Sequence, residues 1–84
     1  MLNLFIGEII LVTCGYAPVG TLPCDGRVLP VTGNTNLYSI LRNNYGGNGN
    51  TTFGIPLLAP PFTASGGTNP MYCIVVSGIY PLIS

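Results

Sequence analysis

The sequence predicts a small α+β domain, mostly β, in which short strands surround one short helix. Residues 8–13 and 71–77 are rich in β-branched and other apolar side chains, as strands are. Residues 34–44 are the one stretch whose apolar side chains repeat with a helical period. Twelve glycines and eight prolines in 84 residues indicate short elements joined by turns. We expect residues 1–84 to form a single domain with a modest core.

Residues 8–13 are expected to form the central strand of the sheet. Beyond Glu8 they are apolar on both faces of the pleat, which is typical of a strand covered on two sides. Residues 2–6 either extend this strand past a kink at Gly7 or belong to a separate arm. Such an N-terminal arm, residues 1–6, would pack on its own chain or on a neighbouring subunit.

An Asp-Gly pair predicts a tight β-hairpin. Residues 21–24 and 27–30 flank Asp25 and Gly26, a dipeptide that readily occupies a type I′ turn. Arg27 beside Asp25 has two interpretations, an active-site pair or a turn whose aspartate accepts a hydrogen bond from its own backbone. The turn is far more common, and we expect it here.

The helix is expected within residues 34–44. Asn34 or Thr35 can cap its first N–H groups, and Asn44 or Gly46 can end it. Two or three turns do not persist alone in water, so the apolar face must pack on the strands. That face is formed by Leu37, Ile40 and Leu41.

Residues 45–53 form a loop rich in glycine and asparagine, which take positive φ easily and allow consecutive tight turns. The rings of Tyr45 and Phe53 can anchor its two ends in the core. A plain surface loop is one interpretation. A ligand loop is the other, in which Tyr45, Asn48 and Asn50 offer a stacking ring and amide groups.

The C-terminal half begins with an irregular stretch. Residues 54–62 contain three prolines, which lack ladder donors, so regular strand pairing should lapse there. Residues 63–70 are a polar, glycine-bearing loop before the strand at 71–77. Residues 79–84 are apolar where a chain end is ordinarily polar, and we expect them to act as a docking tail.

Charge is scarce in this chain. Charged residues make up 5% of the sequence and the formal net charge is zero, so neither repulsion nor an ionic shell keeps two copies apart. Two basic side chains cannot neutralise several phosphates, which argues against nucleic acid as a partner. Membrane insertion is not expected either, because no apolar run approaches about 18 residues. The expected partner is another copy of the chain.

The usual catalytic and metal-binding groups are few. Histidine is absent, so a Cys/His nucleophile pair cannot form, and Glu8 and Asp25 are far apart in sequence. We expect no enzyme activity and no cofactor. Cys14, Cys24 and Cys73 lack zinc-site spacing and are interpreted as small buried apolar residues, with one disulfide, within or between chains, as the alternative.

Five stretches match a known domain in order and spacing, namely residues 7–9, 17–20, 24–26, 36–41 and 45–56. Together they resemble the bacteriophage tail collar domain. Residues 72–74 and 78–81 further resemble the C-terminus of the bacterial microcystin-dependent proteins, which share that domain. The resemblance implies a mixed fold of short strands around one helix and a part in phage tail fibres or related extracellular appendages, often as oligomers.

Two departures from that family bear on function. Thr21 stands where the family usually has tryptophan, and residues 56–60 lack the charges of the corresponding family segment. The long variable region that normally follows is cut to about a dozen residues, so the chain resembles a minimal, insert-deleted version. Since receptor-reading diversity is expected in that insert, its loss favours a building block over an adhesin.

We therefore expect a self-assembling structural subunit of an extracellular fibre, filament or phage tail appendage, which also contacts other tail proteins. The alternative is a receptor- or glycan-binding module at the tip of a tail fibre. The location is extracellular or on a virion, and the N-terminus shows neither a basic region nor a cleavage site of a signal peptide. The expected assembly contacts are Leu4, Phe5, Ile6, Ile79, Tyr80, Leu82 and Ile83.

Overall fold

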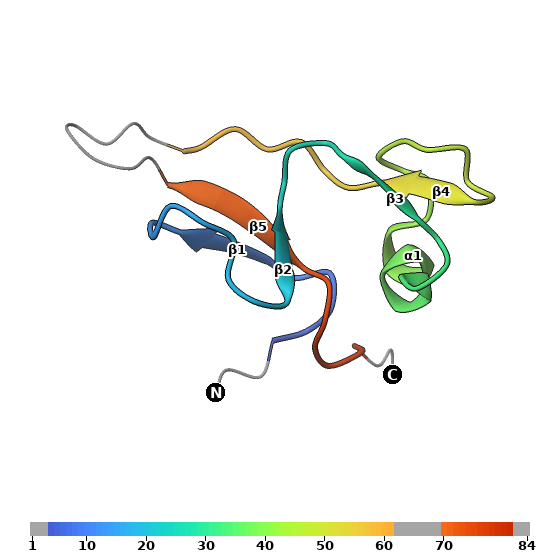
Figure 1. The fold of residues 1–84 in the computed structure, drawn as a ribbon, viewed down its shortest axis with the longest axis horizontal. Coiled ribbons are helices and arrows are strands. Elements are labelled where there is room, and N and C mark those ends of the chain that lie inside the picture. The colour runs from blue at the N-terminus through green and yellow to red at the C-terminus, as the bar shows by residue number, and fades with distance from the viewer. Residues whose placement is uncertain (1–3, 62–69, 82–84) are drawn as a thin grey trace.

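A computed structural model describes residues 4–61 and 70–81 of the chain. These residues form five strands and one helix, which confirms the α+β class with mostly short strands (Figure 1). The elements are β1 (Ile9–Val12), β2 (Thr21–Pro23), β3 (Val28–Pro30), α1 (Thr35–Leu41), β4 (Thr52–Gly54) and β5 (Met71–Val75).

Three of the strands form an antiparallel sheet in the order β1-β5-β2. The predicted strand at the start of the chain exists, but its predicted central place is wrong. The centre belongs to β5, whose Cys73, Ile74 and Val75 are at most 1% exposed. In β1, by contrast, Ile9 and Leu11 are 38% and 44% exposed, because one side of this strand has no covering layer in the described chain.

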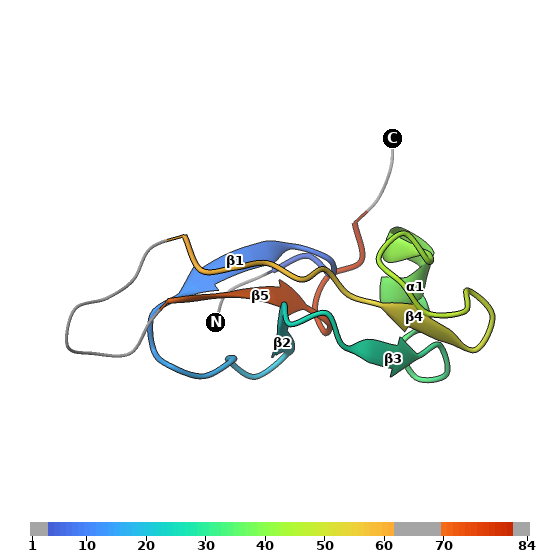
Figure 2. The same cartoon turned by 90° about the horizontal axis from the view of Figure 1, so that it is seen from above.

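The other two strands, β3 and β4, form a separate antiparallel pair. The predicted hairpin between β2 and β3 is therefore wrong, since β2 pairs with β5 and β3 pairs with β4. Asp25 and Gly26 lie in the connection from β2 to β3, where Gly26 has a φ of +80°. This connection leads the chain from one sheet to the other instead of returning it along the same sheet (Figure 2).

The helix is present but shorter than predicted, and its ends differ from the expected ones. The Asn34 side chain makes no capping bond, and its Nδ2 donates instead to the Pro30 carbonyl at 2.9 Å. The helix ends at Leu41 because Arg42 takes a φ of +55°, a left-handed conformation that helices do not continue. Arg42 Nε donates to the Ser39 carbonyl at 3.2 Å, close to the negative end of the helix.

One hydrophobic core joins the two sheets and the helix. Its members come from the N-terminal segment, both sheets and α1. The three-stranded sheet and the β3–β4 pair with α1, which lie side by side in Figure 1, therefore share buried side chains. Tyr38 and Phe53 bring helix and β4 together, with ring centroids 5.4 Å apart. The buried members are Ile6, Cys24, Leu37, Leu41, Phe53, Ile55 and Ile74.

Candidate assembly surface and loop

Residues 4–6, near one end of the chain, lie against Ile79, near the other, and form one apolar surface with Tyr80. Phe5 and Ile79 make a parallel bridge, in which Ile79 N–H donates to the Leu4 carbonyl at 2.9 Å and Ile6 N–H to the Ile79 carbonyl at 2.8 Å. Phe5, Ile79 and Tyr80 are 49%, 44% and 42% exposed. We name Leu4, Phe5, Ile79 and Tyr80 the end patch. Four of the seven predicted assembly residues thus lie together.

Hydrogen bonds fix the end patch to the rest of the molecule. The Tyr80 hydroxyl lies 2.6 Å from Ser39 Oγ, which connects the patch to α1. Among the other predicted assembly residues, Ile6 is only 5% exposed and belongs to the core. Leu82 and Ile83 lie outside the described residues. N-terminal residues 4–6 are therefore packed on their own chain.

The loop between α1 and β4 is held by one side chain. Asn48 Oδ1 accepts hydrogen bonds from three successive backbone N–H groups, those of Asn50, Thr51 and Thr52, at 2.7, 2.8 and 3.0 Å. Its Nδ2 donates to Thr51 Oγ1 at 2.9 Å. The Asn48 amide predicted to meet a ligand is thus occupied by its own loop.

The ends of this loop behave differently from each other. Phe53 is fully buried and anchors one end, as predicted, whereas Tyr45 is 53% exposed and does not anchor the other. Gly47 lies against the backbone of β4, where a Cβ would overlap the Phe53 Cα, and its φ is +80°. Tyr38 takes the place expected of Tyr45, since its hydroxyl donates to the Gly49 carbonyl at 2.8 Å. Helical spacing alone did not reveal this contact.

The acidic and basic pair at the bend has a local role. Arg27 N–H donates to Asp25 Oδ1 at 3.1 Å, which is the predicted backbone turn, and the two side chains form an ion pair at 2.8 Å. Hydrogen bonding from Arg27 lowers the pKa of Asp25 below its usual value. Both side chains are more than 40% exposed, so this pair contributes little to stability.

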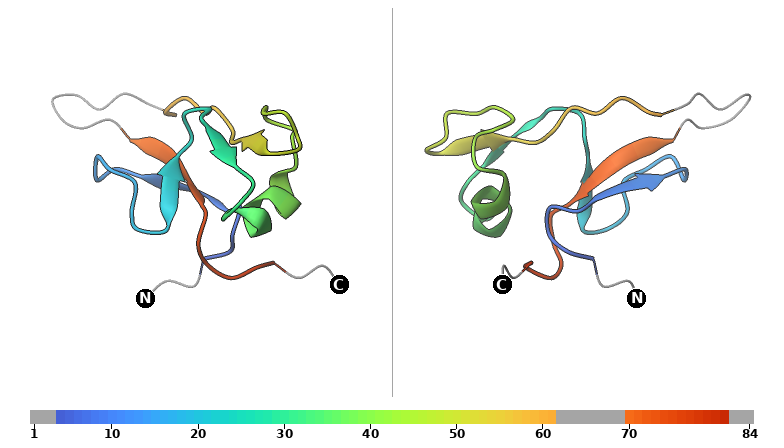
Figure 3. Two further views of the ribbon diagram at one scale, coloured as in Figure 1. Left: turned by 45° about the vertical axis from the view of Figure 1, so that its right-hand side comes forward. Right: turned by 180° about the vertical axis from the view of Figure 1, so that it is seen from behind.

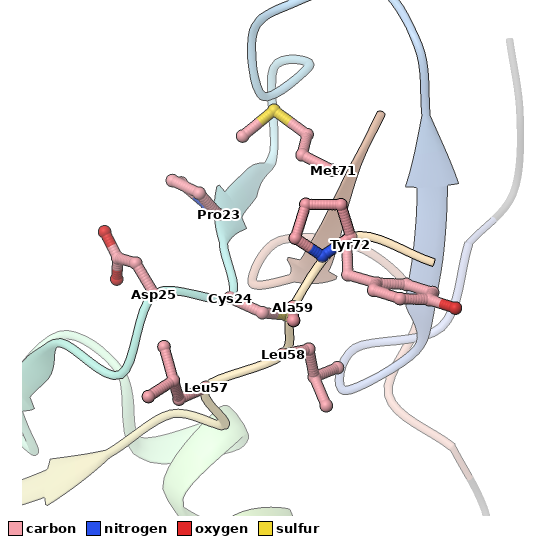
Figure 4. Close-up of a pocket in the computed structure, with 9 residues that line it drawn as sticks. Pro23, Cys24, Asp25, Leu57, Leu58, Ala59, Met71 and Tyr72 are labelled. Carbon is pink, nitrogen blue, oxygen red and sulfur yellow. The ribbon is translucent and has the colours of Figure 1, made fainter. Parts of the chain in front are cut away.

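An apolar groove that the sequence did not predict lies beside this bend. Asp25 and Leu57 form an isolated bridge, and Leu58 N–H donates to the Cys24 carbonyl at 2.9 Å, so the proline-rich stretch is aligned next to β2. The resulting groove has a volume of about 300 Å³. Figure 4 shows side chains of Pro23, Leu58, Met71 and Tyr72 around it. The prolines that keep residues 56–61 extended were the available signal.

The cysteines divide into two kinds. Cys24 and Cys73 are buried, as predicted, and burial is the main cause that raises the pKa of each thiol. Cys14 is exposed, which corrects its predicted burial, because it lies in the turn after β1. Within the described residues all three thiols are free, and no group of three metal-binding side chains is found. No described helix has the length and hydrophobicity needed to cross a membrane.

An exposed apolar patch on a small α+β domain is typical of a surface that contacts another molecule. The family model of the phage tail collar domain matches residues 7–62, which is two thirds of the chain. The chain therefore belongs to the phage tail collar domain family, a family of structural domains and not of enzymes. No match was found among curated proteins or among solved structures.

Proposed function

We propose that this protein is a structural subunit of a phage tail fibre or a related extracellular appendage, and that it assembles with copies of itself. Membership of the collar family supports the structural role in a tail. A net charge of zero with four charged side chains supports self-association, because like copies do not repel. Other tail proteins are the expected neighbours of the assembled form, on the virion.

The observation that carries this proposal is the end patch. The side chains of Phe5, Ile79 and Tyr80 remain between 42% and 49% exposed, although residues 4–6 and Ile79 are joined by backbone hydrogen bonds. A hydrogen-bonded apolar surface gains free energy when a second surface covers it, at about 25 cal/mol for each Å² of apolar area. Because residues 4–6 and Ile79 are already hydrogen-bonded to each other in the monomer, little backbone entropy of these residues is lost when the patch binds.

A lysine substitution in the end patch tests this proposal. We expect Ile79→Lys to weaken assembly by at least about tenfold, because a buried ammonium without a partner is costly. The matched control is Val28→Lys, since Val28 is 55% exposed on β3 and lies outside the patch. Sedimentation velocity over the micromolar range measures both variants and the unmodified protein. A stable monomer for the unmodified protein at these concentrations would refute the proposal.

One side chain of the loop between α1 and β4 remains available for the alternative function, the binding of a receptor or glycan. Tyr45 presents an exposed ring, whereas the Asn48 amide is engaged within the loop. A receptor- or glycan-binding role therefore remains a prediction that depends on Tyr45 and Asn50. Glycan-array and cell-binding measurements on Tyr45→Ala are its test, and unchanged binding would count against it.

A further inference from the structure

The outer edge of β1 is open in the part of the chain that the structure describes. Val75 N–H donates to the Glu8 carbonyl at 2.9 Å, so in an antiparallel ladder Ile10 and Val12 also direct their backbone groups toward β5. Ile9 and Leu11 direct theirs the other way. No backbone hydrogen bond to Ile9 or Leu11 is made on that side by the described residues. Figure 3 shows the sheet that contains β1 from two further sides.

The opposite edge of the same sheet is closed. Cys24 N–H donates to the Tyr72 carbonyl at 3.0 Å, which places the backbone groups of Thr21 and Pro23 on the outside of β2. Thr21 N–H is already bonded to the Pro18 carbonyl at 3.0 Å. Pro23 has no N–H to offer. A further strand cannot pair regularly with β2.

The second sheet is also protected at both edges. On β4, Gly54 N–H donates to the Gly46 carbonyl and Thr52 N–H to Asn48 Oδ1, each at 3.0 Å, so the neighbouring loop covers this edge. On β3, Pro30 lacks a donor and only Val28 has an outward N–H. Within the described residues, β1 is thus the one strand edge at which two alternate residues, Ile9 and Leu11, both have outward backbone N–H and C=O groups free to pair. Within Ile9–Val12 it carries no proline or lysine, two of the usual devices against edge pairing. The bulge at Gly7 and Glu8, where Gly7 N–H donates to the Val75 carbonyl at 2.8 Å, ends before Ile9.

We propose that the β1 edge pairs antiparallel with the β1 edge of a second copy of this chain, giving one six-stranded sheet across a two-fold axis. This inference rests on the proposed self-assembly and gives it a second interface, separate from the end patch. A register centred on Ile10 sets Ile9 opposite Leu11 of the second copy, and Leu11 opposite Ile9. All outward N–H and C=O groups of these residues are then bonded.

The side chains suit the same register. Opposite residues of an antiparallel pair lie on one face of the sheet, so the exposed Ile9 and Leu11 side chains of both copies form a single apolar cluster. The Glu8 side chains are about 14 Å apart along the strands, beyond the screening length of about 8 Å at physiological salt. A second copy therefore fits this edge, and pairing closes both open edges at once.

An apolar groove lies along the same strand. It has a volume of about 450 Å³ and is lined by Ile10 and Val12 of β1 and by Val19 of the following turn, among others. Val19 is fully exposed in the single copy. Because Ile10 of the second copy would extend this face across the two-fold axis, pairing continues the groove from one copy to the other.

Charge exchange at the edge tests this register. Ile9→Lys and Leu11→Glu leave the backbone unchanged, but each removes apolar contact, and we expect each to weaken dimerisation at least about tenfold. Mixing the two variants should restore a heterodimer, because the introduced groups are opposite each other. The control mixture, Ile9→Lys with Ile9→Glu, should not restore it. Sedimentation velocity gives the dissociation constants, and circular dichroism verifies that each variant folds.

The outcomes separate this inference from the proposed function. Assembly of the unmodified protein that both edge substitutions leave unchanged would overturn β1 pairing while self-assembly stands. Restoration by the control mixture and not by the first mixture would overturn the register centred on Ile10. A monomer at all concentrations would overturn both proposals.

Discussion

At the scale of single residues, the Asn48 side chain determines the shape of the loop before β4. One carboxamide makes four hydrogen bonds within the loop, three of them to consecutive backbone N–H groups. Alanine cannot replace these acceptor and donor groups. The loop backbone would then have to bond with water in a less ordered conformation.

We expect Asn48→Ala to lower the free energy of unfolding by about 1–2 kcal/mol. The matched control is Asn50→Ala, because Asn50 is exposed and only its backbone N–H takes part in the network. The control should change stability by less than about 0.5 kcal/mol. Urea denaturation of the two variants gives both values. Equal losses would show that the Asn48 carboxamide does not hold the loop.

The buried thiols make stability depend on pH in the alkaline range. Burial raises the pKa of Cys24 and of Cys73 in the folded state. The folded state therefore retains protons that the unfolded state loses above pH of about 8.5, so stability is full below that pH and falls as pH rises through the folded values. We expect the urea midpoint to decrease above that pH, and Cys24→Ala to decrease less steeply. Parallel pH profiles would contradict this account.

At the scale of elements, the sequence predicted which segments become strands and helix better than it predicted their partners. β1, α1 and β5 lie inside the expected stretches because β-branched runs and helical spacing are local properties. The loop between α1 and β4 and the bend at Asp25 were also predicted from local turn chemistry. Strand pairing was not, because it depends on residues far along the chain.

The two pairing errors have physical causes. The Asp-Gly dipeptide predicts a hairpin turn from local chemistry, yet β2 pairs with β5, whose Ile74 is fully buried, and not with β3. The apolar run of β1 predicts a central strand because both its faces are apolar. In the structure β1 pairs only with β5, and the Ile9 and Leu11 side chains on one of its faces are exposed, so the same apolar pattern fits the edge pairing that we propose. At the candidate site, the apolar composition of residues 1–6 and 79–84 was enough to predict the end patch. The groove beside Leu57 could not be predicted, because it depends on the bridge between Asp25 and Leu57, which are far apart in sequence.

At the scale of the whole molecule, the strand that completes the sheet lies outside the family match. The match ends at residue 62, whereas β5 spans Met71–Val75 and is the only partner of both β1 and β2 in the described chain. β5 also supplies Ile74 to the core that joins the two sheets. Residues 7–62 alone therefore lack the strand that connects their own β1 and β2.

We expect the chain truncated after residue 62 to lose cooperative folding, since removal of β5 breaks two ladders and takes the buried Ile74 and Val75 out of the molecule, which exposes the apolar side chains that pack on them. Adding a synthetic peptide of residues 70–81 should restore structure, because the peptide can bond to β1 and β2 as β5 does. The control peptide carries Ile74→Asp, which places a charge in the core. Circular dichroism during thermal unfolding measures the recovery. A cooperative transition in the truncated chain without peptide would show that the collar-matching residues fold independently of β5, and the single-domain prediction for residues 1–84 would then be wrong.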